Sequence, residues 1–455
     1  KIRKYIIFGL PQSFKLWYFL FMEANILRQI FFDKNSHWES FKKKHGAKIR
    51  PIVTKEVEKF RDCGDIKKGF KLFVCEGCHD VRKVPYRCKG RFCTTCSVGE
   101  SEEWSRLLTE DVLQVNHRHV IFTIDEGLRD VFLLHRHLLK DLMDEAARII
   151  SEFFKKKAKV TPGIIAGLHT FGSRVNFNPH VHMLVTMGGL TKKGKWKQYD
   201  FLPFAMLRKQ WQTVVLKLIR KGVTEKEKKR IQPRLQKAFT NNGEGFYVYA
   251  PKQRGKIKEQ LRYIGRYIRR PAIGINRIEE YDGQYVTFKY IDKTDGIEKK
   301  EKVSVEEFIS RLIRHIPDEQ FKTIRHYGMY SRRSKNLCKK ILVTWQQNTK
   351  RWIIKVKKTL RRQTWRERIV ASGKKDPLVC PHCENYYEYM GEVCLENGKL
   401  EIKVALTKEA RNYLERVIEY YSSVQTPQKR EEKEKRNRSF KEKENIRQLH
   451  LFNVS

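Results

Sequence analysis

The chain has 455 residues and a formal net charge of +44, because 96 lysines and arginines outnumber 52 aspartates and glutamates. This length allows about two to four folded modules, and no apolar run in the chain approaches the length of a membrane span. The large positive charge indicates a polyanionic partner, for which nucleic acid is the usual candidate.

The first part of the chain consists of an apolar start and a helical lead. Residues 1–22 are apolar and aromatic but lack the cleavage site of a signal peptide, and we expect an N-terminal extension outside the folded domains. Residues 23–62 are predicted to be helical and polar, with Trp38, Phe41 and Val57 as their buried anchors.

Six of the ten cysteines lie between residues 63 and 96. Paired Cys-x-x-Cys motifs are typical of zinc sites in a reducing compartment rather than of disulfide frameworks. Two such pairs predict one tetrahedral zinc site that supplies much of the folding energy of this module. Its four expected ligands are Cys75, Cys78, Cys93 and Cys96. The further candidates, for a second zinc site or for a substituted ligand, are Cys63, Cys88 and His79.

The middle of the chain alternates between helical and strand patterns. Helices are predicted over 100–113, 128–157, 203–221, 225–239 and 304–315. Strands are predicted over 119–124, 163–172, 179–187, 245–250, 273–281 and 284–291.

Two histidines flank one apolar residue in the predicted strand 179–187. Side chains alternate faces along a strand, so His180 and His182 point to the same side. Two imidazoles on one face are two ligands for a divalent metal ion. Mg²⁺ or Mn²⁺ suits phosphate chemistry at such a site, and imidazole ligands favour Mn²⁺ on grounds of softness.

The third protein ligand of this ion is predicted from the hairpin that precedes it. If the chain turns over 173–178, His169 falls opposite His182 and shares the metal-facing side. A purely structural role in the sheet is the other interpretation of His169. Asp125 and Glu126, at the end of the first strand, are the alternative ligands.

Two tyrosines lie four residues apart in a predicted helix over 258–270, which Pro271 ends. Residues at this spacing share one helix face, so the phenol oxygens of Tyr263 and Tyr267 would point into one site. Arg266 lies between them, among further arginines suited to phosphate. The alternative is that both tyrosines are core residues.

The C-terminal third is strongly basic. Residues 322–369 interleave Trp345, Trp352 and Trp365 with cationic side chains. This pattern fits a solvated helix face or a surface that binds DNA backbone and bases. Residues 425–448 contain almost no apolar side chain, and we expect a disordered tail.

A third Cys-x-x-Cys motif lies far downstream, at Cys380 and Cys383. Only Cys394 follows it as a further cysteine, so this motif resembles half of a zinc ribbon.

Taken together, these motifs resemble the bacterial rolling-circle insertion-sequence transposases of the two-tyrosine type, in the HUH endonuclease superfamily. The resemblance extends from about residue 26 to residue 393. It rests on the cysteine module and on the passages that begin at His119, Gly167, Asn178, Tyr263, Arg325 and Asp376. The chain departs from the family at Lys71 and Phe92, where a histidine is common.

The resemblance implies an α+β fold, with an HUH endonuclease domain whose central antiparallel sheet is flanked by helices. A small zinc-binding module precedes this domain. The expected divisions are an extension (1–22), a helical lead with the zinc module (23–100), the catalytic domain (101–300), a basic DNA-contacting region with a partial zinc ribbon (301–395), and a helix with a charged tail (396–455).

The same resemblance implies a transposase that nicks single-stranded DNA at element ends through a 5′-phosphotyrosine intermediate. Tyr263, Tyr267 and Arg266 would be catalytic. Zinc would be structural, and DNA rather than a membrane would be the partner, in the bacterial cytoplasm at the nucleoid. Two alternatives stay open, a plasmid-type replication initiator or relaxase and a non-enzymatic zinc protein that binds nucleic acid.

Overall fold

The computed structural model of the chain describes residues 25–90, 92–113, 115–251, 271–292, 294–334, 338, 364, 366–367, 370 and 376–423. The chain divides into two compact units. The larger unit takes residues 1–61 and 89–362, and the smaller unit takes residues 62–88 and 363–455. The smaller unit is therefore discontinuous in sequence, because a long segment of the larger unit separates its two parts.

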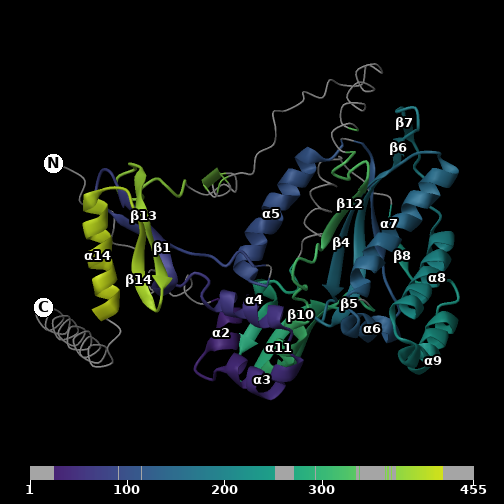
Figure 1. The fold of residues 1–455 in the computed structure, drawn as a ribbon, viewed down its shortest axis with the longest axis horizontal. Helices are drawn as coiled ribbons and strands as arrows, with labels where there is room; N and C mark the ends of the chain where they lie inside the picture. Colours follow the sequence, from purple (N-terminus) through teal and green to yellow (C-terminus); the bar gives the residue numbers. More distant parts are fainter. Residues whose placement is uncertain are drawn as a thin grey trace, which may run out of the picture. The chain divides into compact units, whose positions relative to one another are not determined.

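A five-stranded sheet is the centre of the larger unit (Figure 1). Its neighbouring strands are antiparallel, in the order β12-β4-β5-β3-β8. They are β3 (His117–Phe122), β4 (Gly163–Phe171), β5 (Phe177–Thr186), β8 (Val248–Tyr249) and β12 (Ile324–Gly328). The central antiparallel sheet expected from the sequence is thereby confirmed. The sequence prediction missed β12, because this short strand lies at the start of a strongly basic segment.

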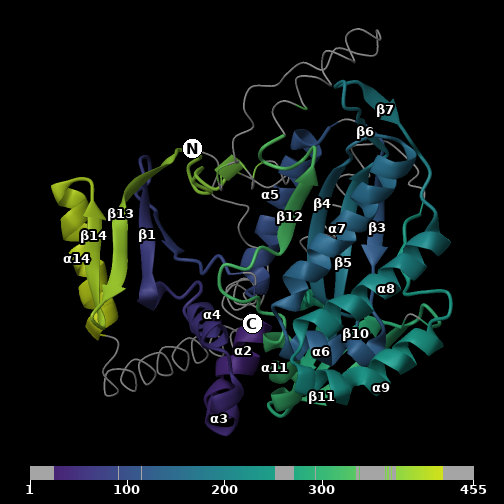
Figure 2. The same cartoon turned by 45° about the vertical axis from the view of Figure 1, so that its right-hand side comes forward.

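One face of this sheet is covered by helices. α7 (Leu138–Lys157) packs on β4 and β5, and α8 (Phe204–Gly222) packs beside α7 (Figure 2). Residues 128–157 were predicted to be one helix, but α6 (Arg129–Leu134) ends at His135, where the backbone leaves the helical conformation. The predicted helix is confirmed over α7, whose apolar face is buried.

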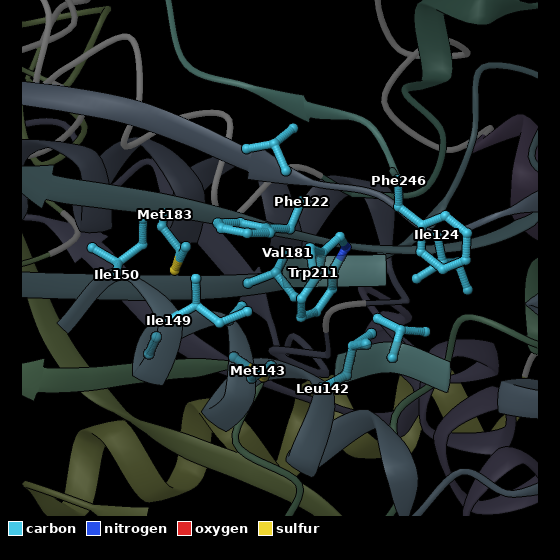
Figure 3. Packing of buried hydrophobic residues seen from close by; sticks show 14 of the residues in the cluster. Phe122, Ile124, Leu142, Met143, Ile149, Ile150, Val181, Met183, Trp211 and Phe246 are labelled. Carbon is cyan, nitrogen blue, oxygen red and sulfur yellow. The ribbon is translucent and has the colours of Figure 1, made fainter. Parts of the chain in front are cut away.

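Trp211 of α8 occupies the middle of this core. Its indole ring packs edge-on against Phe122 with the ring centroids 4.9 Å apart, and its N–H donates to the carbonyl oxygen of Thr123 at 2.6 Å. Figure 3 shows both rings beside Val181 and Met183 of β5. Alternate residues of β5 therefore point into the apolar core, and the residues between them point to the opposite face.

In the described part of the chain, a second apolar cluster covers part of the opposite face of the sheet. There, Leu108 of α5 (Thr94–Asp111) packs with Ile165 and Leu184 of the sheet and with Tyr330, which follows β12. This second, smaller apolar cluster includes Ile165 of β4 and Leu184 of β5. The histidines described below lie further along the same two strands, nearer the turn that connects them.

Three short helices open the described part of the chain. They are α2 (Ile26–Phe32), α3 (His37–His45) and α4 (Pro51–Arg61). Trp38, Phe41 and Val57 are buried among them, as predicted.

Further elements in the described part of the larger unit are a helix, a hairpin, and a second sheet with the helix that follows it. α9 (Glu225–Asn241) follows α8, and β6 (Gly188–Leu190) pairs with β7 (Trp196–Gln198). The second sheet is antiparallel, with the order β11-β10-β9. Its strands are β9 (Ile278–Tyr281), β10 (Tyr285–Ile291) and β11 (Glu298–Ser304), and α11 (Val305–Ile313) follows them.

The described residues of the smaller unit form a four-stranded antiparallel sheet that one α-helix covers. The strand order is β14-β13-β1-β2, so the C-terminal pair β13-β14 joins the N-terminal pair β1-β2 through the pairing of β13 with β1. Its elements are β1 (Gly69–Cys75), β2 (Val81–Pro85), β13 (Tyr387–Glu396), β14 (Lys399–Ala405) and α14 (Lys408–Ser423). α14 covers the sheet with Leu414, which is fully buried against Phe70, Leu72 and Val393.

The α+β class expected from the sequence is confirmed, because antiparallel sheets flanked by helices make up both units. None of the helices in the described ranges has the length and apolar content needed to cross a membrane. Four sequence predictions concern residues outside the described ranges. They are the extension over 1–22, the tyrosine helix over 258–270, the three tryptophans of the basic region and the charged tail over 425–448.

A half-buried histidine from outside the central sheet supports the turn between β4 and β5. His315 follows α11, and its Nε2–H donates to the carbonyl oxygen of Val175 at 3.0 Å. The hydroxyl of Thr170 lies 3.1 Å from Nδ1 of the same ring. Burial lowers the pKa of His315 to about 4. The imidazole is therefore neutral in the folded protein at neutral pH, with one nitrogen donating and the other accepting.

We predict that His315 makes the larger unit less stable as the pH falls from about 6.5 towards 4. In that window the unfolded chain binds a proton at this residue and the folded chain does not, so acid favours unfolding. The contribution is about 1.4 kcal/mol per pH unit. His315→Gln should lower the free energy of unfolding at pH 7, and urea denaturation should show the parental and variant values converging on acidification. Parallel pH profiles would contradict a neutral imidazole at His315.

Candidate functional site

Three histidines converge on the face of the central sheet that lies opposite the helices. His169, His180 and His182 each offer a ring nitrogen, and these nitrogens all lie within 4.8 Å of one another. The rings of His169 and His182 have centroids 4.3 Å apart, and those of His180 and His182 have centroids 4.8 Å apart. His169 and His182 are buried, whereas His180 is partly exposed. One side of the cluster is therefore accessible to a ligand.

The pairing of β4 with β5 brings these residues together. His169 pairs with His180, and His182 pairs with Gly167. The sequence prediction had placed His169 opposite His182, so its register was wrong by two residues. The turn is tighter than expected, since Phe171 pairs with Phe177. A shift of two residues preserves the face to which a side chain points, so His169 still lies on the side of the other two histidines.

Hydrogen bonds orient two of these rings. The Nδ1 of His180 lies 2.7 Å from the carbonyl oxygen of Asn178, which can only accept, so Nδ1 carries the proton and Nε2 is the nitrogen presented to a cation. The Nδ1 of His182 lies 2.9 Å from Nε2 of His119. His119 is on β3, and its pKa is lowered to about 4, first by burial and then by the nearby His180.

The contact of His119 with His182 was missed in the sequence analysis. His119 belongs to the predicted strand 119–124, and its polar ring within an otherwise apolar pattern was the only local signal. Its partner lies 63 residues further along the chain. The contact appears only when β3 pairs with β5, which sets His119 opposite Leu184 and Ile121 opposite His182.

The two acidic alternatives to His169 have other roles in the structure. The carboxylate of Asp125 accepts from the backbone N–H of Gly127 at 2.9 Å and from the side-chain amide of Asn242 at 2.8 Å. Glu126 forms an ion pair with Arg129 at 2.7 Å. Neither belongs to a potential metal cluster among the described residues.

The predicted catalytic residues Tyr263, Tyr267 and Arg266 lie outside the described residues. Their geometry relative to the histidines therefore stays a prediction from the sequence.

A second cluster of potential ligands lies in the smaller unit. The Sγ atoms of Cys75 and Cys383 are 3.4 Å apart, and those of Cys78 and Cys380 are 3.5 Å apart. All four sulfur atoms lie within 4.8 Å of one another. Four thiolates around one tetrahedral zinc ion are about 3.8 Å apart, given a zinc–sulfur distance of about 2.3 Å. The four sulfurs are thus close to the spacing that such a site needs.

The two halves of this cluster have the same backbone structure. In each, the residue four positions after the first cysteine has a positive φ, which is 58° at His79 and 62° at Glu384. Each of these residues donates its N–H to the carbonyl oxygen of the first cysteine, at 3.1 Å and 3.0 Å. The backbone N–H of Asn385 helps to lower the pKa of Cys383 to about 6, which favours a thiolate. Two equivalent turns that face each other are typical of a zinc ribbon.

The grouping of the cysteines differs from the sequence prediction. Cys75 and Cys78 do not join Cys93 and Cys96, and they meet Cys380 and Cys383 instead. The third motif is therefore not an isolated half-site. The physical reason is that β1 pairs with β13, which sets Cys75 opposite Tyr387. Cys394, the partner considered from the sequence, lies further along β13 and contacts Glu396.

The other four cysteines of the N-terminal module form two pairs. In the smaller unit, the backbone N–H of Cys88 lies 3.4 Å from Sγ of Cys63. In the larger unit, Cys93 is the N-cap of α5 and Cys96 lies in its first turn.

Comparison with known proteins gives two family matches. Residues 163–338 match the family described as "Putative transposase", and residues 33–124 match the "Transposase zinc-binding domain". Together these matches cover more than half of the chain. The first match contains the three clustered histidines and the two predicted catalytic tyrosines. The second match contains the six N-terminal cysteines, whereas Cys380 and Cys383 lie outside both.

Individual transposases are also similar to the chain. The transposase for insertion sequence element IS801 of Pseudomonas savastanoi pv. phaseolicola is 27% identical over 316 residues, which are 66% of this chain and 75% of that protein. The putative transposase y4qJ of Sinorhizobium fredii (strain NBRC 101917 / NGR234) is 26% identical over 293 residues, which are 60% of this chain and 72% of that protein. No solved structure matches the chain.

Proposed function

We propose that this chain, which belongs to the transposase family that matches its sheet and zinc-binding regions, nicks single-stranded DNA at the ends of a rolling-circle insertion sequence. It would hold the cleaved strand as a 5′-phosphotyrosine ester and transfer it to a target, in the bacterial cytoplasm. The observation that carries this proposal is the convergence of His169, His180 and His182 on one accessible face of the sheet. A protein that only binds DNA has no need of such a cluster.

The donor atoms of this face fit a divalent cation. Three imidazole nitrogens suit Mn²⁺, and an added oxygen ligand also admits Mg²⁺. Asn178 supplies such an oxygen, since it shares the strand face of His180 and His182, and its Oδ1 is buried without a hydrogen-bond partner in the described part of the chain. A cation held there would polarise the scissile phosphate and offset its charge.

His119 would position His182. Metal binding by Nε2 of His182 requires the proton to be on Nδ1, and that N–H then donates to Nε2 of His119 across the 2.9 Å that separate them. This arrangement requires a neutral His119, which its lowered pKa favours. Residues that orient a metal ligand in this way typically contribute about 10-fold to 100-fold to metal affinity or activity.

The tyrosines would carry the covalent chemistry. The phenol oxygen of Tyr263 or Tyr267 attacks the phosphorus and loses its proton to solvent, while the bond to the 3′-oxygen breaks and that oxygen takes up a proton. The ester conserves the energy of the broken bond, so rejoining needs no nucleotide cofactor. A second tyrosine lets the protein hold one end while it cuts another strand. Arg266 would bind the adjacent phosphate.

We predict that His180→Ala and His182→Ala each reduce nicking of a single-stranded element end at least about 100-fold, because phosphate charge would no longer be stabilised. DNA binding should persist, since the net charge of +44 supplies most of the affinity. Nicking by the parental protein should stop in EDTA and return with Mn²⁺ or Mg²⁺. His45→Ala, which removes a histidine that pairs with Glu306 away from the cluster, is the matched control.

His119→Ala provides a graded comparison in the same experiment. It should reduce nicking by about 10-fold to 100-fold and raise the Mn²⁺ concentration needed for half-maximal rate. Unchanged nicking in either ligand variant would refute the metal assignment. A loss in the His119 variant that excess Mn²⁺ does not relieve would mean that the residue acts on folding alone.

The tyrosine assignment is tested by Phe substitutions, which keep the ring and remove only the hydroxyl. We expect at least one of Tyr263→Phe and Tyr267→Phe to lose the covalent protein–DNA adduct on a denaturing gel. The double variant should lose the adduct completely. An adduct that survives in the double variant would locate the nucleophile elsewhere and leave the histidine result intact.

We also propose that the chain binds a structural zinc ion in the smaller unit. Cys75, Cys78, Cys380 and Cys383 would hold it, because their four sulfurs lie close to tetrahedral spacing. Without the ion, so small a module would lack enough apolar core to fold.

We predict that elemental analysis of the purified protein finds zinc, and that Cys380→Ser lowers the zinc content by about one ion per chain. Cys394→Ser is the matched control, since this cysteine lies on β13 of the same unit outside the cluster. Cys380→Ser should also destabilise the smaller unit, because zinc binding to such sites is linked to their folding. Full zinc content in the Cys380 variant would rule out the four-cysteine site.

A further inference from the structure

Two exposed tyrosines lie at β8, an edge strand of the central sheet, with Tyr249 on the strand and Tyr247 directly before it. Tyr247 and Tyr249 are 51% and 44% exposed, and their rings are nearly parallel, with an angle of 15° and centroids 6.2 Å apart. The guanidinium of Arg208 lies over the ring of Tyr247, 5.0 Å from its centroid. Two large aromatic rings side by side in solvent, with a cation against one of them, offer surface for stacking a planar ligand.

The backbone that carries these tyrosines is held firmly. Phe246, Val248 and Ala250 alternate with them and are buried in the apolar core, where Figure 3 shows Phe246 beside Ile124. The carbonyl oxygen of Tyr247 accepts from both the backbone N–H and the hydroxyl of Thr123. The backbone that carries the two tyrosine rings is therefore well fixed. Binding of a stacked ligand would then cost little conformational entropy of the protein.

A glycine before the strand sets its close approach to α8. Gly245 has a φ of +89°, and a Cβ at this position would meet the backbone of Arg208 at 2.3 Å. The backbone just before β8 therefore lies in close contact with α8, the helix that carries Arg208. This contact explains why the guanidinium lies over the ring of Tyr247.

The tyrosines share the sheet face of the histidine cluster. Ile121 of β3 pairs with His182 on one side and with Tyr249 on the other. Directly paired residues of antiparallel strands point to the same face, so Tyr249 and His182 lie in one row, two strands and about 10 Å apart. Tyr247, two residues before Tyr249, also points to this face. Any strand of DNA whose phosphate reaches the histidines has its neighbouring nucleotides within reach of these rings.

We infer that Tyr247 and Tyr249 form a stacking platform for unpaired bases next to the scissile phosphate, with Arg208 as its cationic partner. The inference rests on the proposed function for the position of the phosphate, and it adds how the substrate is selected. Aromatic rings stack on the faces of unpaired bases, which a duplex keeps covered by base pairs above and below. The platform would therefore favour single-stranded over double-stranded DNA without reading a particular sequence.

The test compares ring removal with hydroxyl removal. Binding of a fluorescein-labelled, mixed-sequence single-stranded oligodeoxynucleotide is followed by anisotropy in EDTA, so that no cleavage interferes. Tyr247→Ala and Tyr249→Ala should each weaken binding about fivefold or more, the usual range for loss of one stacked base. Tyr247→Phe and Tyr249→Phe keep the ring and should bind like the parental chain.

A matched control is available in the second sheet. Tyr285 is 47% exposed, with the ammonium of Lys302 lying 5.0 Å from its ring centroid, but it is on β10 rather than on the histidine face. Tyr285→Ala should leave binding unchanged. All three alanine variants replace exposed side chains, and equal thermal stability would show that each is folded. Tyr→Leu at the same positions replaces the ring by an aliphatic side chain if an alanine variant fails this check.

A second arm tests stacking directly. An oligonucleotide with consecutive abasic positions beside the cleavage site should bind the parental chain more weakly, and the Ala variants should show no further loss with it. A duplex of the same sequence should bind all variants equally. Equal binding of the intact oligonucleotide by the parental chain and the Ala variants would overturn the platform, as would Phe variants as weak as the Ala variants.

The nicking assay separates this inference from the proposed function. Loss of the covalent adduct in Tyr247→Phe or Tyr249→Phe would make that residue a nucleophile, and the platform would be wrong. If the parental chain forms no adduct but the binding differences hold, the stacking site stands and the nuclease proposal falls. If nicking is metal-dependent but the binding differences are absent, the nuclease proposal stands and the stacking site falls.

Discussion

The pairing of β4 with β5 is the constraint on which the histidine face depends. A shift of one residue in this pairing would turn His169 into the apolar core, because side chains alternate faces along a strand. The core itself opposes such a shift, since Val181 and Met183 fill it from the positions next to the histidines. The turn between β4 and β5 is short, and His315 donates a hydrogen bond to the carbonyl oxygen of Val175 within it. Both features restrict the turn from changing the register of the two strands. Apolar packing on one face thus specifies polar chemistry on the other.

The same division of faces extends across the sheet. Phe122 and Val248 continue the buried row, while Ile121 and Tyr249 continue the row of His182. The histidine face of the sheet therefore combines imidazole nitrogens that can bind a cation with tyrosine rings that can stack on bases. The opposite face of the same strands packs against helices. Arrangement on strands rather than on loops gives such a site precise spacing.

The smaller unit folds from two segments that lie far apart in the sequence. Its apolar core is small, and Phe70, Leu72, Val393 and Leu414 are the fully buried residues of its main apolar cluster. β1 and β13 lie about 300 residues apart in sequence but pair directly, and closing so long a loop costs conformational entropy. A metal ion shared by the two cysteine turns would stabilise this closure, because it binds the folded unit and not the separate pieces.

The sequence by itself determined the local features of this protein. Strand alternation predicted that His180 and His182 share a face, helical spacing predicted the helix α7, and Cys-x-x-Cys spacing predicted each pair of thiols. Only the tertiary structure decided which pairs meet, because strand pairing joins residues that no local period connects. It set Cys75 beside Cys383 and His119 beside His182, and it brought β12 to the edge of the central sheet. Periodicity reports which side of an element a residue occupies, whereas packing between elements chooses its neighbour.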